Sequence, residues 1–403
     1  MTFVPDRALL RKYADIFVHF ALNDGKSIEP WSVVYVMLPE CAKPFYLPLQ
    51  ASILEAWAFP IFNYIADGVA RHFLDSLPNN LVEFYPKEYM LARTEAIDYS
   101  IAIIAEADKH EMDWVDTKKM FQRQRAWKFY RDALSKKEDE GKFTWTLWLY
   151  GTQAMADEVG MSLEEYWNQI IQACYLDTPD TVAEWKNIDT ALISIKEHLN
   201  SLDIQSIHMV WDDCDLTIQL GSDRKWLWGS GRNIPSFELF ISPDWRGTQG
   251  WIRFNQPLYR YGTLIEWIEL AFENWLVTKA SAKTNESVLL DMIAQDNANK
   301  VGEYSLTDSR LSRITKFMGE TLYDENVWWP YWNSHIALWK AYKDSYPWDL
   351  STVTEAQWDA MGYNDSVIHT DMISTTNRTV TATTISGEEV VIYKDGHFTF
   401  WNP

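Results

Sequence analysis

Residues 31–38 read Trp-Ser-Val-Val-Tyr-Val-Met-Leu, a short and nearly continuous apolar run. A strand that is buried on both faces of a parallel sheet has this pattern. Similar runs occur at 59–64 and 100–105, and helical spacing of apolar residues marks the segments 6–24, 46–57, 162–175 and 180–199. Because strands alternate with helices, this part of the chain is predicted to be an α/β domain with a parallel sheet covered on both faces.

The pattern changes near residue 203, where short strand-like runs replace helices. These runs lie at 204–211, 216–220, 277–282, 379–384 and 390–394, with helical patterns at 287–300 and 309–318. The tail predicts a hairpin that turns at Asp395-Gly396. We therefore expect two domains, an α/β N-terminal domain at residues 1–200 and a β-rich α+β domain at residues 201–403.

Composition excludes several classes of function. The chain has 403 residues, 36 Lys+Arg and 57 Asp+Glu, and its formal net charge is −21. Such an acidic chain is unsuited to nucleic acid or to an anionic membrane surface. No run is long and apolar enough for a membrane helix or a signal peptide. Three cysteines make no disulfide framework, so we expect a cytoplasmic protein. Neither a dinucleotide-binding motif nor a P-loop occurs.

Candidate metal ligands concentrate in the second half. His369 and Asp371 are two residues apart in an apolar run, so on a strand both face the same side, and Glu238 lies between Phe237 and Leu239. Ionisable groups are rarely fully buried unless they are paired or bind a metal. The other candidates are Glu303, Glu325, His335 and Tyr342. Carboxylates with imidazoles suit Zn²⁺, Co²⁺ or Mn²⁺.

Each of these motifs taken alone also has an ordinary structural explanation. A His-x-Asp pair is more often a surface pair or a satisfied core pair than a metal site. Asp324-Glu325-Asn326 alone is most simply a solvated turn, and His335 and Tyr342 are seven residues apart, as on one helical face of a core.

Together and in this order, the motifs resemble the M29 family of metallo-aminopeptidases. They are Asn233-Ile-Pro-Ser with Glu238-Leu-Phe-Ile-Ser-Pro, Gly302-Glu303, Thr321-Leu-Tyr-Asp-Glu-Asn, His335-Ile-Ala-Leu with Tyr342, and His369-Thr-Asp371. They span about 140 residues of the C-terminal half, and the N-terminal half has no comparably sharp motif.

The resemblance implies an α/β N-terminal domain, a β-rich C-terminal domain that carries the metals, and a homodimer whose active sites face an enclosed cavity. The implied metal ligands are Glu238, Glu303, Glu325, His335, His369 and Asp371. Glu303 would bridge two divalent ions (Zn²⁺, Co²⁺, Mn²⁺ or Mg²⁺), and Tyr342 matches the catalytic tyrosine. The implied substrates are peptides with a free N-terminus, and the ion pair would activate a shared water molecule.

Tryptophan is abundant and glycine is scarce. The chain has 22 Trp and 16 Gly, whereas a usual Gly content of ~7% would give roughly 28. Eleven tryptophans stand where a turn or the family pattern favours glycine: Trp31, Trp57, Trp148, Trp228, Trp267, Trp275, Trp328, Trp329, Trp332, Trp339 and Trp348. Our hypothesis is that they replace glycines, through engineering or an error in the sequence. The alternative is a naturally tryptophan-rich member.

Two other functions remain as hypotheses. The first is a non-catalytic or crippled homologue whose metal site is blocked by tryptophan in place of glycine. The second is a carbohydrate-active protein, because tryptophans stack on sugars and pairs of acids hydrolyse glycosides.

Overall fold

The structure is a computed structural model that describes residues 3–403 except 114, 261–262, 329–332 and 367–368. Its internal contacts divide the chain into two compact units, residues 1–186 with 230–235, and residues 187–229 with 236–403. The division falls inside helix α9 (Thr181–Ser201) rather than after residue 200. The sequence pattern changes only at β5, the first strand of the second unit. The start of α9 belongs to the first unit, where Trp185 donates a hydrogen bond to the Cys174 carbonyl.

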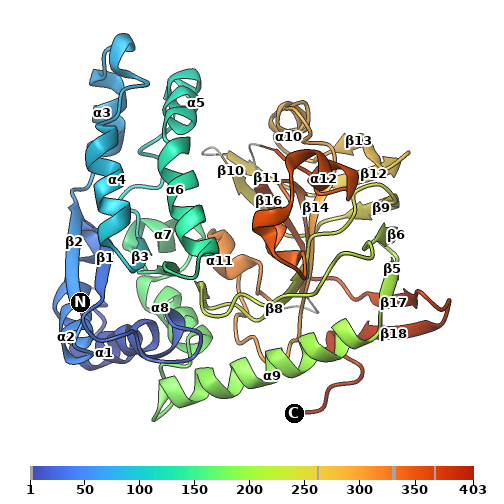
Figure 1. Ribbon diagram of the computed structural model, residues 1–403, viewed down its shortest axis with the longest axis horizontal. Helices are drawn as coiled ribbons and strands as arrows, with labels where there is room; N and C mark the ends of the chain where they lie inside the picture. Colours follow the sequence, from blue (N-terminus) through green and yellow to red (C-terminus); the bar gives the residue numbers. More distant parts are fainter. Residues whose placement is uncertain (1–2, 114, 261–262, 329–332, 367–368) are drawn as a thin grey trace. The chain divides into compact units, whose positions relative to one another are not determined.

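The first unit is a five-stranded, wholly parallel sheet in the order β2-β1-β3-β4-β7, as the alternating pattern predicts. Its strands are β1 (Val33–Pro39), β2 (Phe59–Ile65), β3 (Tyr99–Ile104), β4 (Thr144–Leu149) and β7 (Asn233–Ile234). Its helices are α1 (Arg7–Ile16), α2 (Tyr46–Glu55), α3 (Val69–Ser76), α4 (Lys87–Ala96), α5 (Thr117–Ala126), α6 (Lys128–Asp139), α7 (Gln153–Glu158) and α8 (Leu163–Ala173), followed by the start of α9 (Figure 1). Strand β7 comes from the second half of the sequence but pairs with the sheet of the first unit. It has only two residues, which are too few to show a periodic pattern, so the sequence did not predict it.

An aromatic cluster forms part of the core of the first unit. The indole of Trp148 on β4 is fully buried. Its ring centroid lies 4.6 Å from that of Tyr13, 4.7 Å from that of Phe17 and 4.2 Å from that of Phe45. Large rings packed this closely contribute strongly to a core, although among the described residues the buried Nε1–H of Trp148 has no hydrogen-bond partner.

The second unit is built mainly from antiparallel sheets. An eight-stranded sheet has the order β13-β12-β9-β6-β5-β17-β18-β19, a four-stranded sheet has the order β16-β15-β14-β8, and β10 pairs with β11. The strands of the larger sheet are β5 (Ile204–Trp211), β6 (Cys214–Gln219), β9 (Gln249–Arg253), β12 (Glu269–Glu273), β13 (Leu276–Ser281), β17 (Thr379–Thr384), β18 (Glu389–Lys394) and β19 (His397–Phe398). The remaining elements are β8 (Glu238–Ile241), β10 (Leu258–Arg260), β11 (Thr263–Ile265), β14 (Val301–Thr307), β15 (Asn333–Trp339), β16 (His369–Ser374), α10 (Glu286–Ile293), α11 (Thr321–Asp324) and α12 (Glu355–Ala360).

Two predictions of local structure are wrong in this unit. The helix expected over 287–300 ends at Ile293, and Asn297 has a positive φ of 58°. The helix expected over 309–318 does not form. There the Asp308 carboxylate accepts bonds from both the main-chain N–H and the guanidinium of Arg310. These side-chain bonds compete with helical hydrogen bonds and stabilise a loop.

The hairpin predicted at Asp395-Gly396 is confirmed. Strands β18 and β19 pair antiparallel around these two residues. Their φ angles are 51° and 73°, as a type I′ turn requires at both central positions.

In the described part of the chain, no helix is both long enough and apolar enough to cross a membrane.

Candidate metal centre

Five of the predicted ligand residues lie on the four-stranded sheet of the second unit. Glu238 begins β8, Glu303 lies on β14, His335 lies on β15, and His369 and Asp371 lie on β16. The strands are neighbours in the order β16-β15-β14-β8. Segments that are far apart in sequence are therefore hydrogen-bonded side by side.

The register of the sheet places these side chains on one face. Ala337 of β15 pairs with Glu303 on one side and with Asp371 on the other, and His335 is two residues before it. On β14, Thr307 pairs with Glu238 and lies an even number of residues after Glu303. Because residues two apart on a strand face the same way, the ligands converge. Ala337 carries only a methyl group, which leaves room between the two carboxylates that flank it.

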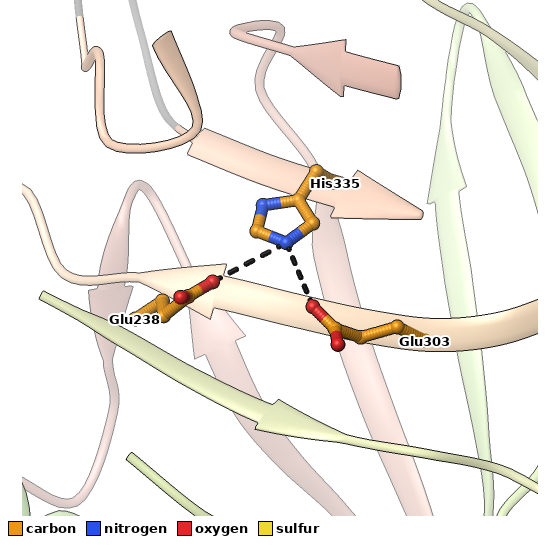
Figure 2. A group of neighbouring side chains, drawn as sticks. All are labelled: Glu238, Glu303 and His335. Atoms are coloured by element: carbon orange, nitrogen blue, oxygen red, sulfur yellow. Dashed lines mark hydrogen bonds and ion pairs between the residues drawn. The ribbon is translucent and has the colours of Figure 1, made fainter. Parts of the chain in front are cut away.

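Two overlapping groups of ligand atoms result. One contains Glu238, Glu303 and His335, and the other contains Glu303, His369 and Asp371, with the ligand atoms of each group within 4.8 Å of one another. In Figure 2 the imidazole of His335 points between the carboxylates of Glu238 and Glu303. Its Nε2 atom lies 3.3 Å from Glu238 Oε2 and 3.2 Å from Glu303 Oε1. Glu303 belongs to both groups, which is the position that a bridging carboxylate requires.

The second group is held by interactions of His369. Its Nε2 atom lies 3.2 Å from Asp371 Oδ1 and 4.0 Å from Glu303 Oε2. Its Nδ1 atom lies 3.0 Å from the Lys340 carbonyl. A hydrogen bond from one ring nitrogen to a carbonyl leaves the other nitrogen free to act as a ligand.

Glu325 and Tyr342 come from loops beside this sheet. Glu325 directly follows helix α11 and is buried. Tyr342 follows β15, and its main-chain N–H donates a 2.7 Å bond to Ser242 Oγ at the end of β8. The ring of Tyr342 lies 4.9 Å from the ring of His369. The structure thus puts all seven predicted site residues in the second unit and links Tyr342 to the second group.

Burial and mutual charge strongly shift the protonation of the site. Burial raises the pKa of Glu238 to about 7, although the charge of His335 opposes this. Burial likewise raises the pKa of Glu325 well above its ordinary value, and the negative charges of neighbouring carboxylates raise it further. Without a cation, burial therefore favours the protonated forms of Glu238 and Glu325.

The pKa values of the two histidines and of Asp371 are set by the charges beside them, which outweigh the effect of burial. Burial alone would lower the pKa of His335, but its bond to Glu303 and the charges of Glu238 and Asp371 raise it to about 9. The pKa of His369 is also raised to about 9, against the effect of burial, chiefly by Asp371. The pKa of Asp371 falls to about 2 despite burial, because His369 and His335 lie beside it.

The residues present fit a divalent cation. Among the described residues, two buried atoms of this cluster have no hydrogen-bond partner, Glu325 Oε1 and His335 Nδ1, whereas Asp371 Oδ1 lies 3.2 Å from His369 Nε2. Unpaired buried oxygens of carboxylates are costly unless a cation or a proton compensates them. Four acids and two imidazoles form a donor set for Zn²⁺, Co²⁺ or Mn²⁺.

Three residues that the sequence motifs do not include support the proposed ligands. Ser305 Oγ donates a 3.1 Å bond to Glu238 Oε2, and Ser236 Oγ donates a 3.3 Å bond to Glu238 Oε1. Arg260 Nη2 donates a 3.2 Å bond to the His369 carbonyl, and its charge contributes to the low pKa of Asp371. Each serine lies two residues from a proposed ligand, Ser305 on β14 and Ser236 just before β8, and this spacing is a signal that the sequence contains. Arg260 has no such signal.

The tryptophans suspected of replacing glycine differ in backbone conformation. Trp31, Trp57, Trp267 and Trp275 have positive φ angles of 69°, 62°, 55° and 72°. Glycine alone adopts this region without strain. Trp148, in contrast, lies within the parallel sheet. Trp329 and Trp332 lie outside the described residues.

The sequence matches the family described as thermophilic metalloprotease (M29) over residues 6–398. Aminopeptidase AmpS of Bacillus subtilis is 26% identical over 412 residues, covering 95% of this chain and 98% of that protein. Aminopeptidase 2 of Geobacillus stearothermophilus is 23% identical over 96% of this chain and 98% of that protein. The solved structure of wild-type AmpT from Thermus thermophilus superposes with a TM-score of 0.83 at 23% identity, covering 97% of this chain and 99% of that one.

Proposed function

Because the chain belongs to the M29 family of thermophilic metalloproteases, we propose that it is a metal-dependent aminopeptidase that removes the N-terminal residue of peptides at a dinuclear site. The observation that carries the proposal is the presence of Glu303 in both groups of ligand atoms. The residues that would hold two divalent ions are Glu238, Glu303, Glu325, His335, His369 and Asp371. Such ions would lower the pKa of a shared water molecule toward neutrality.

The residues of the chain supply proton transfer and polarisation. Glu303 has a carboxylate that can accept a proton from the attacking water and return it to the leaving amine. Burial and the negative charges of Glu303 and Asp371 raise the pKa of Tyr342. Its phenol therefore keeps its proton at neutral pH and can donate a hydrogen bond to the scissile carbonyl as negative charge develops there.

Recognition of the free α-amine would make the enzyme an exopeptidase. That amine needs an anionic or a metal anchor in the site. An acetylated N-terminus lacks the free amine, so it could not use such an anchor. We further propose that the enzyme is a homodimer and that it is cytoplasmic, the latter in keeping with three cysteines that form no disulfide framework, Cys41, Cys174 and Cys214.

The test is hydrolysis of leucine p-nitroanilide by chelator-stripped protein, before and after addition of Co²⁺ or Zn²⁺. We expect activity only with metal, and none on N-acetyl-leucine p-nitroanilide. Activity that survives complete metal removal would contradict the proposal.

The second candidate is a non-catalytic or crippled homologue whose metal site is blocked by tryptophan. It is favoured by Trp328, which lies three residues after the proposed ligand Glu325 and is partly buried. Folded protein that binds fewer than two metal ions per chain and hydrolyses no aminoacyl anilide would support it. Membership of a peptidase family leaves the carbohydrate-active alternative without support.

A further inference from the structure

Glu325 differs from the other proposed ligands in how its position is fixed. The other five lie on paired strands of one sheet, whereas Glu325 follows a helix of four residues, α11. Strand pairing therefore does not fix the turn that carries Glu325, and other contacts must hold its buried side chain beside the sheet.

Asn326, the next residue, provides a restraint toward β8. Its side chain is fully buried. The main-chain N–H of Phe237 donates a 2.8 Å bond to Asn326 Oδ1, and Asn326 Nδ2 donates a 3.4 Å bond to the Leu322 carbonyl in α11. Phe237 immediately precedes Glu238. One amide therefore joins the residues that adjoin two proposed ligands, Glu325 and Glu238.

Asn333 provides a second restraint toward β15. Its Nδ2 atom donates a 2.7 Å bond to the Val327 carbonyl and a 3.3 Å bond to the Asp324 carbonyl. Asn333 is buried and lies two residues before His335 on the same strand. The turn that carries Glu325 is thus fastened on one side to the strand of Glu238 and on the other to the strand of His335.

We propose that Asn326 and Asn333 are positioning residues that hold Glu325 against the ligand-bearing sheet and thereby set the affinity of the metal position to which Glu325 contributes. This inference rests on the proposed dinuclear site. Side chains that orient ligands typically change metal affinity by about 10–100-fold when they are removed. Neither asparagine touches the substrate in this scheme, so its effect acts through Glu325.

The experiment is a titration of the full-length, chelator-stripped protein with Co²⁺, followed by calorimetry and by the visible absorption of bound Co²⁺. The variants are Asn326→Ala, Asn326→Asp and Asn333→Ala. Asn200→Ala is the matched control, because Asn200 also accepts a main-chain N–H, at 2.7 Å, and donates to a carbonyl, at 3.1 Å, both of Trp226. That segment carries no proposed ligand.

We expect Asn326→Ala and Asn333→Ala to weaken one of two Co²⁺ sites about 10–100-fold and to change its absorption, while the other site is retained. Asn326→Asp keeps the oxygen that accepts from Phe237 but loses the donor to the Leu322 carbonyl, so its affinity should fall less than that of Asn326→Ala. Asn200→Ala should leave both sites unchanged, even if it lowers the unfolding temperature.

The outcomes separate the two proposals. Wild-type protein that binds no Co²⁺, or one ion per chain, refutes the dinuclear site itself. Wild-type protein with two sites, combined with unaltered sites in Asn326→Ala and Asn333→Ala, refutes only the positioning role. Equal weakening in Asn200→Ala also refutes it, because the loss would then come from general destabilisation. If Asn326→Ala does not fold, Asn333→Ala decides the question.

Discussion

The imidazole Nε2 of His335 lies 3.2 Å from Oε1 of Glu303, and both side chains are almost completely buried. In the metal-free chain, the protonated imidazole of His335 balances the negative charge of the neighbouring carboxylates, which a metal cation would otherwise balance. Protons and metal ions therefore compete for the same buried groups.

The first prediction concerns the pH dependence of stability. The folded-state pKa values of His335 and His369 are raised to about 9, and that of Glu238 is raised to about 7. A raised folded pKa gives stability that is complete below the unfolded pKa and is lost as pH rises through the folded value. The stability of metal-free protein should therefore fall steadily from about pH 5 to pH 9.

The contribution of Asp371 to stability depends on pH in the opposite direction. Its folded pKa is lowered to about 2, so its contribution is present above the unfolded pKa and is lost on strong acidification. Thermal unfolding followed by circular dichroism from pH 3 to pH 10, with a chelator or with Co²⁺, measures both effects. The gain in unfolding temperature from Co²⁺ should grow with pH, and a gain independent of pH would contradict the proposed coupling.

The second prediction concerns Glu303. Glu303→Gln keeps the shape of the side chain but removes the carboxylate that serves both groups, so kcat should fall by at least ~10²–10⁴-fold, the usual contribution of a general acid or base. Steady-state hydrolysis of leucine p-nitroanilide measures the loss. Glu389→Gln, on the exposed part of β18, is the control and should retain full activity. A Glu303→Gln enzyme with near-normal kcat would exclude the assigned role.

The third prediction concerns the phenol of Tyr342. Tyr342→Phe should lower kcat by ~10²–10³-fold, as expected when one donor to a developing oxyanion is removed, with Co²⁺ affinity unchanged. The control is Tyr346→Phe in the same loop, where the ring packs 5.2 Å from that of Trp358. If Tyr342→Phe instead loses Co²⁺ and keeps its kcat once loaded, Tyr342 supports the metal site rather than the reaction.

The fourth prediction concerns Trp31 and Trp57. The main-chain N–H of Trp31 donates a 2.7 Å bond to the Trp57 carbonyl, and both residues have positive φ and exposed indoles. Glycine would relieve ~1–2 kcal/mol of strain at each site and would add ~0.5–1 kcal/mol of entropy cost. Trp31→Gly and Trp57→Gly should therefore each raise the free energy of unfolding slightly, as urea titration can measure. Trp148→Gly is the contrasting control and should lower it by roughly 3–5 kcal/mol or more.

The fifth prediction concerns the origin of the strained tryptophans. Asn274 and Trp275 have φ angles of 52° and 72° between β12 and β13, and a type I′ turn favours Asn-Gly at this place. Peptide mass spectrometry of the protein isolated from its natural source should find glycine at the four positive-φ positions. Tryptophan at all four would establish a naturally tryptophan-rich member.

The local structure of the chain follows largely from its sequence. The apolar run at 31–38 contains most of β1, and the run at 204–211 forms β5, because burial on both faces leaves a continuous apolar run and burial on one face leaves an alternating one. Ser162 and Glu165 form the capping box that begins α8. The helix predicted over 309–318 does not form, because hydrogen bonds to the carboxylate of Asp308 take the place of helical hydrogen bonds. The spacing of apolar residues gives no sign of this competition.

The sequence by itself determined which residue types are available for a metal site and that some of them lie in apolar segments. Only the tertiary structure decided that Glu238, Glu303, His335 and Asp371 share one face of a sheet, because strand register depends on pairing between distant segments. It also decided that Glu303 lies in both groups of ligand atoms and that buried amides fasten the turn of Glu325. These contacts join residues that are far apart along the chain, where spacing carries no information about distance.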